Sequence, residues 1–478
     1  MNTTIRGLLA ASVIAIASLG GALYLAHEQP GRDVDRQTVF EGGPGMASLD
    51  INSLLSNPHM SDQRLLDNAF RQVEKAYYKP VDAQVMVNGE RRELVAYLKQ
   101  HHIAQPAIPP STATGDETAD LQLLNRNLRL AQTEYGKATS NAELTQAAIR
   151  GMLNALGDPY TTYLSPAEIS SLEESLNGGD FGGIGVYMVV DPRTKYVLVE
   201  PIEGTPAFRA GIKVGDEIVA VEGKRIAGTP LDDVERRIRG PVGTPVHLQV
   251  RSHLKGGAPL AYGPTRTVVL TREQIYVPSV HAKMEDGFEY VRLADFGKTS
   301  YEEVRKAMLS GKSHGAKGYI LDLRNNGGGL LDAAVQISSL FIPDGTIVST
   351  IDREGNKDVK TATHDVIGAT PLVLLVNKYT ASASEITAGA VQDYHVGTLI
   401  GTKTFGKGVV QSIYNLSDGG ALKITTARYV TPLGRDIHHR GIQPDTVVDQ
   451  QVDPGLIDTP RDAQLAAAKA HLRRLAAR

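Results

Sequence analysis

The sequence predicts a mixed α/β protein of several domains, and three observations lead to this prediction. The chain has 478 residues, more than one hydrophobic core usually organises. Between residues 61 and 156, apolar positions recur at steps of three and four, which is typical of helices that bury one face. After Arg272, short apolar runs alternate with helical patterns, as expected for a sheet covered by helices.

Residues 5–26 are small and apolar apart from Arg6. Such a run at an N-terminus is typical of export, so residues 1–27 are predicted to be a signal peptide or an uncleaved membrane anchor. Residues 28–60 are rich in glycine, proline and charge and are predicted to be a linker. We therefore expect an exported protein that contacts a membrane only through its first segment.

Residues 61–165 are predicted to form an N-terminal helical region, with a third helix over 141–156 capped by Asn141 and a loop at 105–115. The first two apolar stripes are Leu65, Leu66, Ala69, Phe70, Val73 and Tyr77, and then Leu121, Leu124, Leu128, Ala131 and Tyr135. Stripes of this kind usually form a core. A dimer or partner face is the alternative.

Composition and spacing exclude several classes of function. The net charge of −3 argues against a nucleic-acid-binding protein, and the absence of cysteine excludes a thiol nucleophile and cysteine metal ligands. The pairs His101-His102 and His438-His439 lack the spacing of a metal-binding helix, and no GxSxG motif is present. No metal or other cofactor is expected.

The residues from 371 to 411 predict a hydrolytic site. The apolar run 371–376 is typical of a buried strand, and a helical run over 386–392 follows a polar turn. Ser382 or Ser384 would then lie at a helix start, where backbone N–H groups and the helix dipole stabilise an oxyanion. Lys407, among glycine and apolar residues, would complete a Ser–Lys pair.

Local sequence leaves other interpretations of these residues open. Ser382 and Glu385 also fit a capping box, in which the serine only satisfies helical N–H groups. Lys407 alone could be a solvated loop lysine. The spacing of Gly401, Gly406 and Lys407 resembles a phosphate-binding loop, but a glycine follows the lysine where Ser or Thr is needed, and the next run alternates like a strand. Nucleotide binding is therefore excluded.

Four motifs together resemble the signature blocks of the carboxyl-terminal processing peptidases, which are PDZ-containing, tail-specific serine proteases. They are Tyr319-Ile-Leu-Asp-Leu-Arg-Asn-Asn-Gly-Gly-Gly-Leu330, Ala381-Ser-Ala-Ser-Glu385, Thr404-Phe-Gly-Lys-Gly408 and Thr426-Ala-Arg-Tyr-Val-Thr-Pro432. The resemblance covers residues 144–448, and it departs from the family at Gly327, where proline is usual. The stretch Asp158-Pro-Tyr-Thr-Thr-Tyr-Leu-Ser-Pro166 resembles the family's entry to its PDZ domain.

The resemblance implies a domain plan. A crotonase-like ββα protease core would occupy 273–450, an inserted PDZ domain 181–272, and a helical tail 451–478. About fifty residues near 82–140 look inserted relative to the family. With the apolar N-terminal residues, we expect an exported protein that is periplasmic or anchored in the bacterial inner membrane facing the periplasm.

The resemblance also assigns roles to residues. Ser382 lies 25 positions before Lys407, the family spacing of nucleophile and base, so it is preferred over Ser384. A lysine buried without a counter-carboxylate has a lowered pKa and can accept the serine proton. Gln411, four positions further along an alternating strand, would orient the lysine.

Two backbone sites follow from the same resemblance. The N–H groups of Gly328 and Ala383 would form the oxyanion hole, although a tight turn explains the glycines equally well outside the family. The carboxylate-binding loop of the PDZ domain would consist of Gly182, Gly183, Ile184, Gly185 and Val186. Its N–H groups would hold the terminal carboxylate of a peptide that pairs with the following strand.

The expected function is that of an exported serine endopeptidase that recognises apolar C-terminal tails through its PDZ domain and forms an acyl-enzyme. An adaptor or activator protein and a second copy of the chain are further expected partners. The alternatives are a catalytically silent PDZ scaffold and a ligand-binding protein on the same fold. Retention of Ser382, Lys407 and Gln411 argues against both. Whether the PDZ domain delivers substrate or blocks the site stays open.

Overall fold

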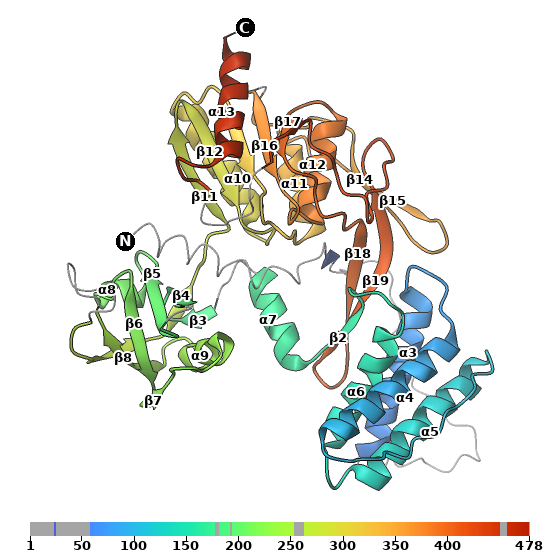
Figure 1. The fold of residues 1–478 in the computed structure, drawn as a ribbon. Helices are drawn as coiled ribbons and strands as arrows, with labels where there is room; N and C mark the ends of the chain where they lie inside the picture. Colours follow the sequence, from blue (N-terminus) through green and yellow to red (C-terminus); the bar gives the residue numbers. More distant parts are fainter. Residues whose placement is uncertain are drawn as a thin grey trace, which may run out of the picture.

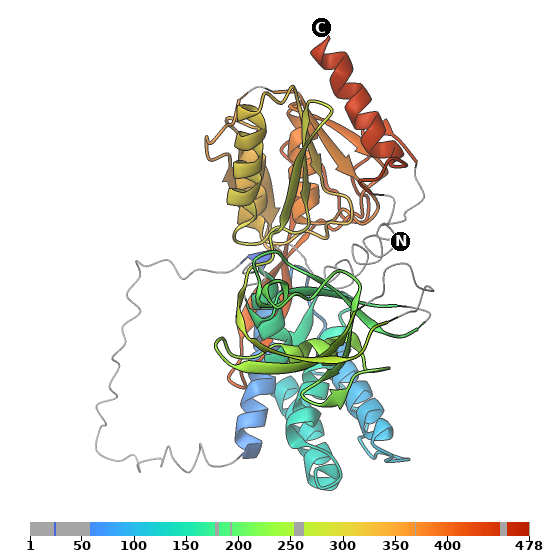
Figure 2. The ribbon, with the colours of Figure 1, turned by 90° about the vertical axis from the view of Figure 1, so that its left-hand side faces the viewer.

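The computed structural model describes residues 23–24, 58–176, 181–191, 194–252, 262–368, 370–449 and 457–477. Apart from residues 23–24, the predicted signal or anchor lies outside these ranges, as does most of the predicted linker. No helix in the described part of the chain is long and apolar enough to cross a membrane. Figures 1 and 2 show three parts: a mixed core, a small β domain, and a helical region joined to the core by a long two-stranded ribbon.

The helical region has one core. Its helices are α3 (Pro58–Ala76), α4 (Ala83–Gln100), α5 (Glu117–Tyr135) and α6 (Asn141–Asn154). The predicted apolar stripes bury their side chains together, and Leu66, Phe70, Leu94, Leu128 and Ile149 are fully buried. The segment expected as an insertion supplies α4 and α5 to this same core. The cap of α6 is Ser140 rather than Asn141, because the Ser140 side chain accepts the N–H of Glu143.

The small β domain is an antiparallel sheet with two helices. Its strand order is β4 (Val186–Val190), β5 (Val197–Pro201), β6 (Asp216–Val221), β8 (Pro245–Arg251) and β9 (Arg266–Thr271), with β7 (Lys224–Arg225) on β6. The helices are α8 (Pro206–Arg209) and α9 (Leu231–Ile238). At the base of the domain, β3 (Phe181–Gly183) pairs with β10 (Glu273–Ile275), so the entering and leaving chains meet.

The mixed core is a six-stranded sheet covered on both faces. Its strand order is β11 (Val280–Glu285), β12 (Phe288–Leu293), β13 (Tyr319–Asp322), β16 (Leu372–Val376), β17 (Thr398–Gly401) and β20 (Thr446–Val447). Strands β11 and β12 pair antiparallel, and all the other neighbouring strands of this sheet pair parallel. One face packs on α10 (Ser300–Ser313), α11 (Leu331–Ser339) and α12 (Ala383–Asp393), and the other on α13 (Ala463–Ala476). Coverage of both faces explains the unbroken apolar run of β16.

A second six-stranded sheet carries the ribbon to the helical region. It contains β18 (Val409–Asn415), β19 (Ala421–Val430), β14 (Thr346–Ile351), β15 (Lys357–Thr361), β1 (Leu23–Tyr24) and β2 (Thr162–Leu164). Strand β19 belongs to two cores: Leu422 and Ile424 lie in the helical core, and Ala427 and Tyr429 lie in the mixed core. Helix α7 (Pro166–Leu176) leaves β2 toward the small β domain.

Candidate active site

Ser382 lies at a strained turn between β16 and α12. Its φ of 57° and ψ of −117° place it in a region that residues other than glycine rarely adopt. The Ser382 N–H donates to a carboxylate oxygen of Glu385 at 3.0 Å, and the Ser382 carbonyl accepts the hydroxyl of Tyr429 at 2.9 Å. These bonds hold an unfavourable backbone conformation, as is common for a nucleophile at a strand-to-helix turn. In this structure the serine is fully buried.

Two buried side chains bind both Ser382 and Lys407. The Glu385 carboxylate accepts the N–H groups of Ser382, Gly406 (2.7 Å) and Lys407 (2.8 Å), and the hydroxyl of Thr404 (2.5 Å). The hydroxyl of Tyr429 is shared between the carbonyls of Ser382 and Lys407, the latter at 2.7 Å. The two predicted catalytic residues are therefore held beside each other by common partners.

Sequence reasoning missed the role of Glu385 and Tyr429 as links between these residues. Glu385 had a local signal, because the capping-box pattern predicts its bond to the Ser382 N–H. The capping and nucleophile interpretations of Ser382 are thus compatible. Tyr429 lies 47 residues from Ser382 and belongs to the motif over residues 426–432, but nothing in the sequence linked it to Ser382. Burial raises its pKa well above the ordinary value, which keeps the phenol a hydrogen-bond donor.

Lys407 lies in the loop before β18 and is 4% exposed. The pKa of its amine is lowered to about 7, chiefly by burial and also by the nearby charge of Lys423, while Asp158 and Glu385 act in the opposite direction. The sequence argument assumed that no carboxylate lay near this lysine. The structure places two there, but burial outweighs them. Lys423, a second buried lysine on β19, was not predicted.

Gln411 lies on β18 and is fully buried. Its side-chain N–H donates to the hydroxyl of Thr425 at 3.2 Å, while its side-chain oxygen has no hydrogen-bond partner among the described residues. A bulge between Val410 and Gln411 interrupts the pairing with β19, so simple alternation does not carry through from Lys407. The unpaired oxygen is an acceptor suited to an ammonium group.

The two predicted oxyanion donors are neighbours in space. A Cβ on Gly328 would lie 2.9 Å from both the Ala383 nitrogen and the Ser382 Cβ, so the close approach requires glycine, which also has φ +105° here. The Gly328 N–H donates to the side-chain oxygen of Asn326 at 2.8 Å. We find no acceptor for the Ala383 N–H within the described ranges.

Asn326 joins the glycine loop to the nucleophile turn. Its side-chain N–H donates to the carbonyl of Leu293 at 2.9 Å, and its own carbonyl accepts the N–H of Ala381 at 3.0 Å. The same carbonyl accepts the hydroxyl of Ser384 at 3.1 Å. Ser384 is thus committed to bracing this loop, which favours Ser382 as the nucleophile.

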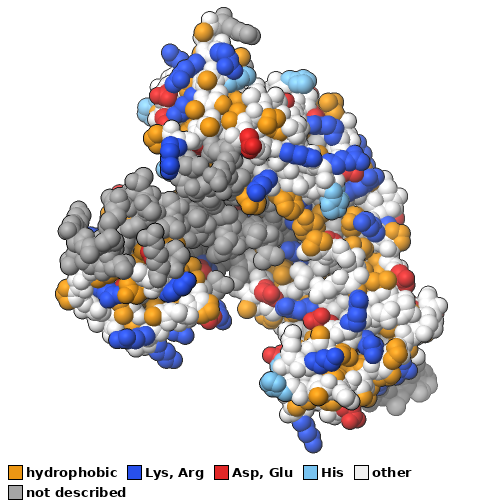
Figure 3. Space-filling model, in the orientation of Figure 1, with side chains coloured by type: hydrophobic (Ala, Val, Ile, Leu, Met, Phe, Trp, Pro, Cys, Tyr) orange, Lys and Arg blue, Asp and Glu red, His pale blue; other side chains and the backbone are white. Residues whose placement is uncertain are grey.

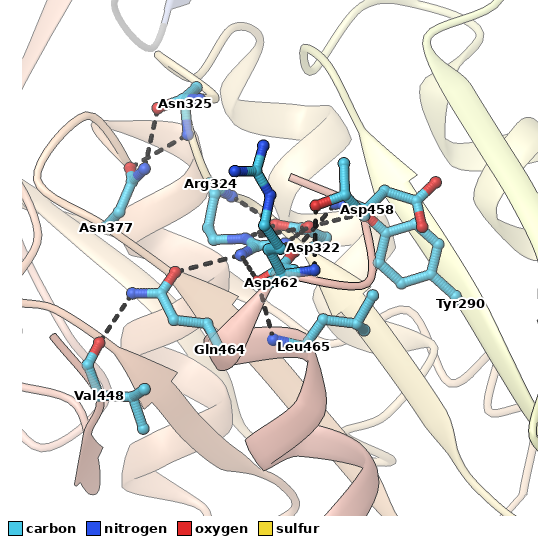
Figure 4. Close-up of polar contacts among 12 residues, drawn as sticks. Tyr290, Asp322, Arg324, Asn325, Asn377, Val448, Asp458, Asp462, Gln464 and Leu465 are labelled. Carbon is cyan, nitrogen blue, oxygen red and sulfur yellow. Dashed lines mark hydrogen bonds and ion pairs between the residues drawn. The ribbon is translucent and has the colours of Figure 1, made fainter. Parts of the chain in front are cut away.

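A buried ion cluster fixes the start of the glycine loop (Figure 4). The Arg324 guanidinium contacts Asp322 at 2.6 Å and Asp462, the N-cap of α13, at 2.8 Å, and all three are nearly inaccessible to solvent. Asn325, with φ +61°, forms a side-chain pair with Asn377 at 2.8 Å. The loop is therefore held from α13 on one side and from the turn after β16 on the other.

Sequence models match peptidase family S41 over residues 288–448, a PDZ domain over 197–252 and the N-terminal domain of the activating protease CtpB over 95–167. A carboxyl-terminal-processing protease of Synechocystis is 40% identical over 74% of this chain and 82% of its own length. The Bacillus subtilis carboxy-terminal processing protease CtpA is 36% identical over 70% of each chain.

The chain belongs to the carboxyl-terminal processing proteases. These are serine proteases of family S41 that carry a PDZ domain, as the four motifs predicted. Among solved structures, the photosystem II D1 C-terminal processing protease is 31% identical and covers 85% of this chain and 99% of its own, with a TM-score of 0.46.

The PDZ domain of the protease has an open sheet edge. Strand β4, which follows the predicted carboxylate-binding loop, has a strand neighbour on one side only within the described part of the chain. In the loop, the Gly185 carbonyl accepts the hydroxyl of Thr205 at 3.0 Å, and Gly182 and Gly183 pair with β10. The loop is therefore tied to the strand that leads into the protease core.

The described ranges of the protease hold no cluster of three or more His, Asp or Glu side chains arranged for a metal ion. On the face in view in Figure 3, basic and acidic side chains of the described residues are intermixed.

Proposed function

We propose that this protease is an endopeptidase with a Ser382–Lys407 dyad. The observation that carries the proposal is that one carboxylate and one phenol bind both residues, while burial lowers the pKa of Lys407 to about 7. A lysine with that pKa is substantially neutral at pH 7 to 8, and a neutral amine can accept the serine proton.

The reaction follows from these groups. The Ser382 oxygen attacks the scissile carbonyl as its proton passes to the Lys407 amine, and the resulting ammonium then protonates the leaving amine. An ester between substrate and Ser382 remains. Neutral Lys407 next takes a proton from water as the water oxygen attacks the ester. The ester bond to Ser382 then breaks, the serine oxygen takes the proton back from Lys407, and the carboxylic acid is released. The unpaired side-chain oxygen of Gln411 is suited to accept a hydrogen bond from the ammonium while the ammonium exists.

The N–H groups of Ala383 and Gly328 would stabilise the negative oxygen of the tetrahedral intermediate. The Gly328 N–H must first leave the side chain of Asn326, to which it donates. Together with the complete burial of Ser382, this bond supports a resting conformation that rearranges when substrate enters.

We further propose that substrates are exported proteins with apolar C-terminal tails. The open edge of β4 supports binding of such a tail by strand addition, with its carboxylate at Gly182–Val186. The apolar N-terminal residues support a periplasmic location, free or anchored in the bacterial inner membrane. An adaptor or activator, or a second copy of the chain, would assist at this stage.

The test is cleavage of an unfolded model protein that ends in small apolar residues, with full-length wild type and three variants. Ser382→Ala and Lys407→Ala are expected to reduce cleavage to background, whereas Ser384→Ala keeps most of it, because its hydroxyl only braces Asn326. Lys407→Arg is also expected to be inactive, since a guanidinium is not deprotonated.

Binding of the same tail is measured in parallel by calorimetry. Cleavage that survives Ser382→Ala would contradict the dyad. Tail binding without cleavage by any form, wild type included, would favour the silent PDZ scaffold.

A further inference from the structure

The amine of Lys407 lies under an aromatic ring from outside the protease core. Its Nζ is 4.2 Å from the centre of the Tyr160 ring. Tyr160 belongs to the segment between α6 and β2, which connects the helical region to the second sheet. Tyr160 lies in the stretch 158–166, which resembles the family's entry to its PDZ domain, and the resemblance assigns it no part in the site.

A series of hydrogen bonds holds this connecting segment against the ribbon of β18 and β19. The Asp158 carboxylate accepts the Tyr160 N–H at 3.0 Å and the Thr161 hydroxyl at 2.7 Å. The Thr161 oxygen in turn accepts the Thr425 N–H at 3.0 Å. The hydroxyl of Thr425 accepts the side chain of Gln411, so the segment and the predicted lysine-orienting residue share an anchor.

We propose that Tyr160 is a positioning residue for the catalytic base: its ring covers the Lys407 amine and keeps water away from it. The inference rests on the proposed Ser–Lys function. It assigns the helical region a part in catalysis, because that region holds the segment that places the ring.

The ring has two opposing effects on the lysine. An aromatic face attracts a cation, which favours the protonated amine, and it also displaces water, which disfavours the same form. Burial is the largest influence on the pKa of Lys407, and the amine remains nearly inaccessible to solvent. Exclusion of water is therefore the effect that decides the protonation state.

Other charged groups face the amine and stay in place when the ring is removed. They are Lys423 from β19, Asp158 from the connecting segment and Glu385 from α12. Burial raises the pKa of Tyr160 itself, so its phenol brings no charge near neutral pH. A change in the pKa of Lys407 upon loss of the ring can then be attributed to hydration of the amine.

The experiment is the pH profile of kcat/KM for full-length wild type, Tyr160→Phe and Tyr160→Ala. The acid limb of this profile reports the protonation of the free base. Tyr160→Phe keeps the ring and is expected to keep the limb. Tyr160→Ala admits water, and the limb is expected to move to higher pH by about one unit, with activity recovering near pH 9.

A neighbouring pair provides a milder perturbation with a matched control. Thr161→Val removes the hydroxyl that links Asp158 to Thr425, and it is expected to move the limb in the same direction by a smaller amount. Thr162→Val removes a hydroxyl that donates only to the adjacent carbonyl of Tyr163 at 3.3 Å, and the limb should stay in place. His438→Asn checks that the limb does not belong to this nearby histidine, whose Nδ1 accepts the Gly408 N–H.

The outcomes separate this inference from the function on which it rests. An unmoved limb in Tyr160→Ala, or a limb moved to lower pH, overturns the inference while the dyad stands. If Tyr160→Ala does not fold, as judged by its thermal unfolding, the Thr161→Val profile decides, and an unmoved limb there overturns the inference. Wild-type cleavage that needs neither Ser382 nor Lys407 would instead overturn the proposed function.

Discussion

The two halves of the candidate site are built differently. The nucleophile half consists of Ser382, Ala383 and the glycine loop, and its supports, from Asn326 to the Arg324 cluster, all belong to the protease core or to α13. The base half is assembled from several parts of the chain. Lys407 and Gln411 are contacted by the connecting segment and by β19, which also enters the helical core.

This difference shows which properties each half controls. The nucleophile half is held by side-chain hydrogen bonds to backbone groups and by a buried ion cluster, which fix its geometry. The base half depends on burial, which sets the charge of an amine. Changes in the helical region should therefore affect the pH dependence of the reaction, and changes near α13 should affect its geometry.

The largest effect is expected where the two halves meet, at Glu385. Glu385→Gln replaces one of two acceptor oxygens by a donor that faces N–H groups already in place. We expect kcat/KM to fall by about 100-fold or more and the free energy of unfolding by about 3 kcal/mol. Steady-state kinetics and urea denaturation measure both, with the exposed Glu354→Gln as control. Near-wild-type activity would contradict the joint role of Glu385.

A change confined to the base half is expected to alter stability in a pH-dependent way. The folded state lowers the pKa of Lys407 from 10.5 to about 7, so between these values the unfolded chain binds more protons and the contribution of this group to stability rises with pH. Lys407→Met should raise the free energy of unfolding by about 4 kcal/mol near pH 7 and by about 1 kcal/mol near pH 10.

Urea denaturation at the two pH values tests this expectation. The exposed Lys306→Met serves as the control and should change stability little at either pH. An equal effect of Lys407→Met at pH 7 and pH 10 would show that the lysine is not held neutral by the fold.

The smallest effect is expected at the outer support of the nucleophile half. Asp462→Asn keeps a residue that can cap α13 but removes the charge that faces Arg324. We expect a loss of about 1–2 kcal/mol in stability and a fall in kcat of less than ten-fold, with KM unchanged. Asp116→Asn makes the same exchange at the cap of α5, away from the site, and should leave kcat unaltered. Equal kcat values for the two variants would show that the contact between α13 and the glycine loop does not affect catalysis.

Much of the fold was predictable because its signals are local. The helical stripes, the buried strand β16 and the helix after Ser382 all follow from periodicity, and each is present. The motifs identified the family, and homology to the processing proteases bears this out. The cap of α6 was misplaced by one residue because Ser140 and Asn141 are both good caps.

The supports of the site were not predictable, since they join distant parts of the chain. Arg324 contacts Asp462, which lies 138 residues away in the sequence. Tyr160 contacts Lys407, although the whole PDZ domain separates them in the sequence. The position of Gln411 was inferred from alternation, which the bulge at Val410 interrupts. Lys423 gave no signal, because a lysine in a strand is usually solvated.

The shared strand β19 has a consequence for how this chain can be divided. Among the described residues, the hydrophobic core of the PDZ domain is drawn from residues 184–270, so we expect that this domain can be excised or exchanged as a module. The helical region cannot be removed in the same way. Its removal would leave Leu422 and Ile424 of β19 exposed to water next to the catalytic strand, so enzyme and helical region must be inherited, and engineered, as a single piece.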